Sequence, residues 1–139
     1  MKLLDNDILS LHLKGEPTTR SRVAAISSGQ LFVPIVAIEE TLRGWLNLIR
    51  LADAGKAKVP IETAYARLRQ AVSDLSAYRI LNYTPTAHEH YLRLKSQKLR
   101  IGTRDLRIAS IALAHDATLI TRNRRDFDIV PSLKLEVWN

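Results

Sequence analysis

Acidic residues recur where predicted strands or turns give way to helices and loops: Asp5, Glu40 (beside Glu39), Asp105 and Asp126. In a parallel sheet, the carboxyl ends of neighbouring strands meet at one edge, so these acids would share one site. Carboxylates held within several ångströms of one another repel by about 1 to 4 kcal/mol per close pair. Raised pKa values or a bound divalent cation would offset that repulsion.

The surrounding composition favours the cation. The chain has no cysteine, and His88 and His90 are two residues apart, so they point to different helix faces and form no zinc pair. Hard oxygen ligands favour Mg²⁺ or Mn²⁺. Such an ion beside arginine-rich segments suits the hydrolysis of phosphodiester bonds.

Each acid also suits a purely structural role, as a helix cap (Asp5, Asp7), a helix-start residue (Glu39, Glu40, Asp105) or a solvated loop residue (Asp126, Asp128). Taken singly, these alternatives stay open. The functional interpretation rests on all the acids falling at one predicted edge.

The charge balance indicates a nucleic-acid partner. Among 139 residues there are 21 basic and 14 acidic ones, a net charge of +7, and Arg outnumbers Lys two to one. The planar arginine fork donates two parallel hydrogen bonds to phosphate. Two basic clusters flank the acids of the C-terminal half: Arg93, Lys95, Lys98, Arg100, Arg104, Arg107, and then Arg122, Arg124, Arg125. A basic surface without any nucleic-acid role is the alternative.

Periodicity predicts alternating strands and helices. Strands are expected at 2–5, 31–36, 80–83, 117–121 and 133–138, the last at a sheet edge, and helices at 8–13, 18–28, 37–54, after Pro60, 86–98 and 105–115. Thr86 and Glu89 form a predicted capping box. Strands alternating with helices of this length imply an α/β fold with a mainly parallel sheet covered on both faces.

Several classes of protein are excluded or disfavoured. The longest apolar run, 31–38, is too short to span a membrane, and acidic residues at the N-terminus argue against a secretory signal, so a cytoplasmic protein is expected. Neither a dinucleotide-binding nor a P-loop glycine pattern is present. No repeat or linker divides the chain, and we expect one domain over residues 1–139.

Four motifs resemble those of PIN-domain ribonucleases, most closely the VapC-type toxins of type II toxin–antitoxin systems. In chain order they are LLDNDIL around Asp5, EETLRG with Glu40 four residues before Gly44, IGTRDLRIASIAL around Asp105, and TRNRRDF ending in Asp126 and Phe127. The family's first motif usually reads D-T-[ND], so Asn6 departs from it at the middle position.

The resemblance implies a PIN-like, flavodoxin-like parallel sheet flanked by helices on both faces. It also implies four carboxylates around Mg²⁺ or Mn²⁺, with Asp5 and Asp105 as direct ligands and Glu40 preferred over Glu39 for its spacing to the glycine. By the same resemblance, Asp126 acts through water or positions the nucleophile. Three further residues would orient the acids: Thr121, Asn123 and Asp7, the last of which suits a helix cap equally well.

The resemblance further implies a metal-dependent endoribonuclease that cuts translation-linked RNA such as tRNA, forms a homodimer and is inhibited by a VapB-like antitoxin. Trp45, Leu48 and Leu51 extend beyond the apolar stripe of their helix and would suit a partner groove or a wider buried stripe. The competing hypothesis is a catalytically silent PIN-like module that binds RNA without cutting it.

Overall fold

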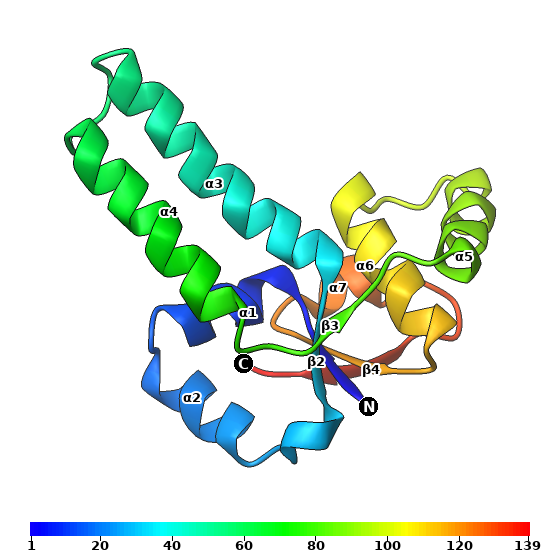
Figure 1. Cartoon of the computed structure of the whole chain (residues 1–139). Coiled ribbons are helices and arrows are strands. Elements are labelled where there is room, and N and C mark those ends of the chain that lie inside the picture. The colour runs from blue at the N-terminus through cyan, green and yellow to red at the C-terminus, as the bar shows by residue number, and fades with distance from the viewer.

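The computed structural model describes all residues, 1–139, as an α/β fold built on five parallel strands (Figure 1). The strands lie in the order β3-β2-β1-β4-β5, and every neighbouring pair is parallel. Their bounds are β1 Lys2–Leu4, β2 Leu31–Pro34, β3 Ile80–Leu81, β4 Thr118–Thr121 and β5 Lys134–Val137. The predicted parallel sheet is confirmed, and β5 is the expected edge strand.

Helices connect the strands and cover both faces of the sheet. They are α1 Asn6–Leu13, α2 Pro17–Ala24, α3 Ile35–Asp53, α4 Ile61–Leu75, α5 Pro85–Ser96, α6 Thr103–Ala114 and α7 Arg124–Phe127, with a short 3₁₀ turn at Ser28–Gln30. Figure 1 shows α3 and α4 as a long hairpin that projects away from the sheet. No helix is both long and apolar enough to cross a membrane.

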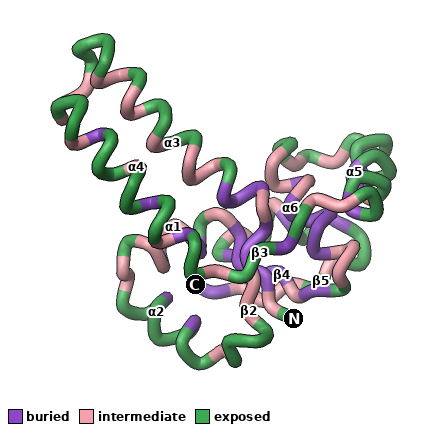
Figure 2. Tube along the Cα trace, in the orientation of Figure 1, coloured by how far each residue is buried: buried purple, intermediate pink, exposed green.

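Side-chain alternation in the two central strands builds a core on each face. Leu3 and Leu119 belong to one buried cluster, formed with α5 and α6, whereas Leu4 and Ile120 belong to another, formed with α1 and the base of α3. Consecutive residues of a strand point to opposite faces, so each strand serves both clusters. Burial is concentrated there, while the far end of the α3–α4 hairpin is largely exposed (Figure 2).

Several predicted element boundaries are wrong, including the ends of β2 and α2 and the cap of α5. The second strand ends at Pro34 rather than at residue 36, and α3 begins at once, so the apolar run 31–38 is divided between a strand and a buried helix start. The cap of α5 is Thr84, whose Oγ accepts from the Ala87 N–H at 3.1 Å, because Pro85 suits the first helical position. The helix predicted at 18–28 stops at Ala24.

Candidate active site

Asp5 directly follows β1 and is fixed by contacts on two sides. Its backbone N–H donates to the Ile120 carbonyl at 3.0 Å, which extends the pairing of β1 with β4. Its Oδ1 accepts from the Ile8 N–H at 2.9 Å, so the residue also caps α1. The side chain is almost fully buried, at 3% exposed. Capping and membership of the acidic site are therefore two roles of one carboxylate.

The second oxygen of Asp5 is held from the neighbouring strand. The hydroxyl of Thr121, at the end of β4, donates to Asp5 Oδ2 at 2.5 Å. The Asn123 N–H in turn donates to the Thr121 hydroxyl at 2.9 Å. Because β1 and β4 are adjacent and parallel, their last residues meet at the same edge of the sheet. The structure thus connects two of the sequence motifs through hydrogen bonds.

A pocket of about 170 Å³ opens at this edge. Its lining residues come from α1, α3, α6 and the segments that follow β1 and β4: Asp5, Asn6, Asp7, Glu40, Asp105, Asn123 and Phe127. We call it the acidic pocket. Four of the five acids proposed from the sequence therefore lie around one cavity, at the position where parallel sheets place their sites.

Burial and mutual repulsion raise the pKa of two of these carboxyls. For Asp5, desolvation raises the pKa to about 6, against the lowering effect of the hydrogen bonds from Thr121 and Ile8. For Asp105, desolvation and the charges of Asp126, Glu40 and Asp7 raise the pKa to about 6. In both groups the ionised form is energetically unfavourable, and a bound cation would remove that free-energy cost.

The two adjacent glutamates, Glu39 and Glu40, lie in different surroundings. Glu40 lines the acidic pocket and forms an ion pair with Arg104, with 2.8 Å between Oε1 and Nη1. Glu39 lies outside the pocket, exposed to solvent, and pairs with Arg43 one turn along the same helix at 2.8 Å. A step of one residue on a helix turns a side chain by about 100°, which accounts for the separation.

Asp126 lies beside the pocket rather than in its lining. Asn123 caps the short helix α7, and its Nδ2 donates to Asp126 Oδ2 at 2.6 Å. The charge of Asp126 still contributes to the raised pKa of Asp105. Asp128, by contrast, is exposed and lies 4.0 Å from Arg124. Asn123 therefore links Asp126 to Thr121, and through it to Asp5.

The donor set fits a divalent cation by its chemistry. All the acidic ligands are oxygens, which suits Mg²⁺ or Mn²⁺, and each Asp5 oxygen makes one hydrogen bond and retains a second lone pair. However, no three acidic or histidine side chains are arranged as a ready coordination group. Glu40 is turned to Arg104 instead. The predicted ligand set therefore stays a prediction, and it requires Glu40 to exchange Arg104 for the ion.

Sequence reasoning missed some neighbours of the acids. Arg104, the partner of Glu40, was noted only as part of a basic cluster, although it directly precedes Asp105. Phe127 was quoted in its motif without a role, and it closes one wall of the acidic pocket. Of the proposed partner groove, Leu48 and Leu51 are half-buried, and Trp45 lines a separate pocket.

Comparison with known proteins settles the family. The PIN-domain family model matches residues 2–133, nearly the whole chain. This chain belongs to the PIN-domain family. The resemblance found in the four motifs is therefore confirmed, and the acidic pocket lies within the matched PIN domain.

Similar proteins carry the VapC name. This PIN domain is 38% identical over 69 residues to "Ribonuclease VapC2" of Rickettsia felis, an alignment that covers 47% of this chain and about half, 52%, of that relative. It is 24% identical over 141 residues to "tRNA(fMet)-specific endonuclease VapC" of Shigella flexneri, covering 99% of this chain and 97% of that one.

Solved structures of the same fold include toxin–antitoxin complexes. The VapBC2 complex of Rickettsia felis bound to promoter DNA superposes with a TM-score of 0.74 at 24% identity, covering 99% of this chain and 98% of that one. VapBC-1 of nontypeable Haemophilus influenzae superposes with a TM-score of 0.72 at 22% identity, covering 99% and 97%. At these identities the likeness establishes the PIN-like fold.

Proposed function

We propose that this PIN domain, one domain over residues 1–139, is a VapC-type, Mg²⁺- or Mn²⁺-dependent endoribonuclease. The observation that carries the proposal is the acidic pocket itself, in which two carboxyls with pKa values raised to about 6 meet at the carboxyl edge of the sheet. The net charge of the chain is +7, so a local cluster of acids stands out from its overall composition. Grouped carboxyls with raised pKa values are typical of functional sites.

Each acid has a part in the proposed reaction. Asp5, held by Ile8 and Thr121, is a rigid ligand, and Asp105 and Glu40 complete the proposed ligand set. A bound divalent ion would neutralise charge on the phosphate and make a bound water more acidic. Asn123 engages only Oδ2 of Asp126, so Oδ1 is free to orient a water and to accept its proton.

RNA is the substrate that the surface favours. A depression of about 570 Å³ shares Glu40 and Asp105 with the acidic pocket and contains Arg107 together with Arg43 and Arg104, which pair with Glu39 and Glu40. Another depression, of about 480 Å³, shares Asp7 and Asn123 with the acidic pocket and contains Lys14 and Arg122. An RNA strand that crosses the acids would therefore meet basic side chains next to the reacting phosphate.

The relatives suggest the biological setting. One is named a tRNA(fMet)-specific endonuclease, and several solved neighbours are VapBC complexes. We therefore propose tRNA or another translation-linked RNA as the substrate class, a VapB-like antitoxin as the inhibitor, a homodimer as the assembly and the cytoplasm as the location. Exposed apolar side chains on the α3–α4 hairpin, Leu46, Tyr65 and Val72, offer surface for protein partners.

Cleavage of RNA tests the enzyme. Purified protein, freed of any antitoxin, is incubated with total RNA and with tRNA in Mg²⁺, in Mn²⁺ or in EDTA, beside the Asp105→Asn variant. The proposal predicts discrete fragments that require both the metal and Asp105, and mapping their ends identifies the cut site. Asp128→Asn is the matched control, because that acid is exposed and outside the pocket, and it should cut like the native chain.

Two results would decide against the enzyme. RNA binding without any metal-dependent cut would favour the silent binding module. Cutting that persists in EDTA, or equally in Asp105→Asn, would point to a contaminating nuclease and leave the acidic pocket without a catalytic role.

A further inference from the structure

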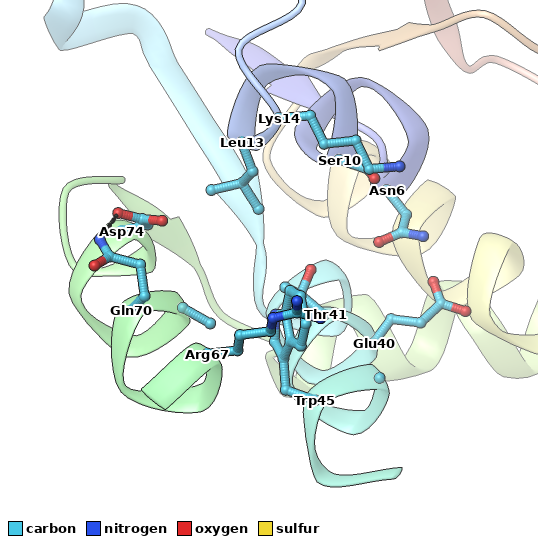
Figure 3. Close-up of a pocket in the computed structure, with 12 residues that line it drawn as sticks. Asn6, Ser10, Leu13, Lys14, Glu40, Thr41, Trp45, Arg67, Gln70 and Asp74 are labelled. Atoms are coloured by element: carbon cyan, nitrogen blue, oxygen red, sulfur yellow. Dashed lines mark hydrogen bonds between the residues drawn. The ribbon is translucent and has the colours of Figure 1, made fainter. Parts of the chain in front are cut away.

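One ion pair joins the acidic pocket to the depression that contains Arg43, Arg104 and Arg107, which we call the arginine depression. Glu40 Oε1 accepts from Arg104 Nη1 at 2.8 Å, which connects α3 with α6 across 64 positions of sequence. Glu40 lines both cavities, whereas Arg104 lines only the arginine depression. Figure 3, which draws the neighbouring pocket lined by α1, α3 and α4, shows the Glu40 side chain pointing away from Trp45. The ion pair therefore holds Glu40 at the boundary between the acids and the arginines.

Glu40 is the one acid of the acidic pocket that has a basic partner. The lining contains four carboxylates, those of Asp5, Asp7, Glu40 and Asp105, and among them only Glu40 forms an ion pair. The guanidinium of Arg104 thus supplies positive charge to a group of acids that suits a divalent ion. Because the guanidinium and the ion would bind the same carboxylate, the ion pair opposes metal binding at Glu40.

Both side chains have the freedom to exchange partners. The Glu40 side chain is 27% exposed and that of Arg104 is 38% exposed, and the bond between them is the only side-chain hydrogen bond of either. The second carboxylate oxygen of Glu40 and the remaining N–H groups of Arg104 have no partner in the chain. An arginine fork with open donors suits phosphate, to which it donates two parallel hydrogen bonds. Solvent-accessible ion pairs add little to the stability of a fold, so this one is easily broken.

We propose that Arg104 alternates between Glu40 and a phosphate of the RNA substrate, and that it thereby couples the binding of RNA to the binding of the metal. Without RNA, Arg104 holds Glu40 and competes with the ion. When a phosphate enters the arginine depression, the guanidinium moves to it, and Glu40 becomes available as a ligand. Arg104 is then a positioning residue that acts on the metal through Glu40. The inference rests on the proposed ribonuclease function and adds to it a reason why RNA and metal bind together.

The ion pair next to it on α3 supplies a matched control. Arg43 pairs with Glu39 at 2.8 Å one turn along the same helix, and Glu39 lies outside the acidic pocket. Arg43→Gln and Arg104→Gln each remove one arginine of the arginine depression and one ion pair with a glutamate of α3. Only Arg104→Gln releases a proposed metal ligand, so the two variants separate competition for Glu40 from a change in net charge.

Metal affinity in the absence of RNA tests the competition. Mn²⁺ is added to the antitoxin-free protein at physiological ionic strength, and the free ion is measured by electron paramagnetic resonance. Arg104→Gln should bind Mn²⁺ about three- to fivefold more tightly than the native chain, which corresponds to about 0.6 to 1 kcal/mol for an accessible ion pair. Arg43→Gln should change the affinity less, since salt screens a charge that binds no ligand. In a Glu40→Gln background, Arg104→Gln should bring no such gain, because no carboxylate is left to compete for.

The coupling to RNA is measured in an Asp126→Asn background, which keeps Asp5, Glu40 and Asp105 but lacks the proposed proton acceptor, so that RNA is bound and not cut. Anisotropy gives the affinity for a labelled single-stranded oligoribonucleotide in EDTA and in saturating Mn²⁺. Mn²⁺ should increase the RNA affinity, and RNA should increase the Mn²⁺ affinity by the same factor. Arg104→Gln should reduce this factor by the same ratio by which it improves Mn²⁺ binding alone, because one ion pair underlies both effects.

Salt dependence tests whether phosphate is the second partner of Arg104. In saturating Mn²⁺, Arg104→Gln should lower the slope of log RNA affinity against log salt by about 0.7, the value for one phosphate contact on a single strand. An unchanged slope would show that Arg104 does not reach a phosphate, and the proposed exchange would be wrong.

The outcomes separate the exchange from the enzyme. If the native protein cuts RNA with metal, but Arg104→Gln binds Mn²⁺ no more tightly than Arg43→Gln does, the exchange is wrong and the nuclease stands. If Arg104→Gln lowers the Tm of the metal-free protein without any gain in Mn²⁺ affinity, the pair is only a structural link between α3 and α6, and the proposal fails. If the gain and the coupling are both found but no RNA is cut, the exchange stands and the nuclease is wrong.

Discussion

Replacing Asp5 by Asn should stabilise the metal-free protein at pH 8, although it removes an acid of the proposed catalytic set. Burial raises the pKa of this carboxyl from 3.8 to about 6. A shift of about 2 units corresponds to about 3 kcal/mol of unfavourable free energy for the ionised, folded state. Because Asn is neutral at every pH, Asp5→Asn removes that cost.

The hydrogen bonds reduce the gain. The Asn amide oxygen can accept from the Ile8 N–H, as Oδ1 does now, but its amino group replaces the oxygen that accepts from the Thr121 hydroxyl. Thr121 then loses an acceptor, at a cost of about 1 kcal/mol. The net expectation at pH 8 is about 2 kcal/mol of added stability, which for a chain of this length raises the Tm by about 6 °C.

The stability gained by Asp5→Asn depends on pH in a direction that follows from the raised pKa. A carboxyl whose pKa is raised on folding binds its proton more tightly in the folded chain, so the penalty is absent below pH 4. It develops as the pH rises from about 4, where the unfolded carboxyl ionises, to about 6, where the folded one ionises, and it is complete by pH 8. The advantage of Asp5→Asn should therefore appear between pH 4 and pH 7 and should vanish or reverse at pH 3.5.

Thermal unfolding followed by circular dichroism in EDTA, from pH 3.5 to 8, measures this difference. Asp128→Asn is the control, since Asp128 is exposed and its nearest cation is 4.0 Å away, and its Tm should follow the native curve. A Tm for Asp5→Asn that lies below the native value by the same amount at every pH would refute the reasoning. Asp5 would then act only as a hydrogen-bond acceptor and helix cap.

Three further predictions follow from the same contacts. Mg²⁺ or Mn²⁺ should stabilise the native chain by about 1.4 kcal/mol for each tenfold excess over the Kd, which is measured as a rise in Tm. The Tm of Asp5→Asn should not rise, and equal shifts in both proteins would place the ion elsewhere. Thr121→Val removes the donor to Asp5 Oδ2, so the pKa of Asp5 should rise further, and denaturation should show a loss of about 2 kcal/mol at pH 8 and a smaller loss at pH 4. Gly44→Ala should stabilise α3 by about 0.5 to 1 kcal/mol in denaturant titrations, because a Cβ at this helical position meets nothing within 4 Å; a loss of stability would show that the methyl group is not accommodated there.

Local patterns in the sequence were sufficient to predict the fold class and the main acids. The alternation of strand and helix periods predicted the parallel sheet, and such a sheet gathers its strand ends at one edge, which located Asp5 and Asp105 near each other. The spacing of Glu40 to Gly44, through the family resemblance, was enough to prefer Glu40 to Glu39, and Glu40 lines the acidic pocket. These inferences succeeded because the periodicity of a helix or strand is carried by residues that are close together in the sequence.

Boundaries inside continuous apolar runs were not predictable from the same patterns. The run 31–38 carries no alternation, and it divides at Pro34 because its second half is a helix start buried against the sheet. Likewise, Thr84 rather than Thr86 caps α5, since both have a suitable side chain and the position of Pro85 decides between them. Burial by distant elements sets the first of these limits, whereas Pro85, a local feature, sets the second.

The tertiary structure alone decided which polar groups meet. Thr121 reaches Asp5 across 116 positions of sequence, and Arg104 reaches Glu40 across 64, because crossovers bring β4 beside β1 and α6 beside α3. The pocket lined by α1, α3 and α4 likewise exists only once α1 packs against α3 and α3 packs against α4. Sequence spacing determines the face on which a side chain lies, whereas its partner depends on chain segments that become neighbours only through folding.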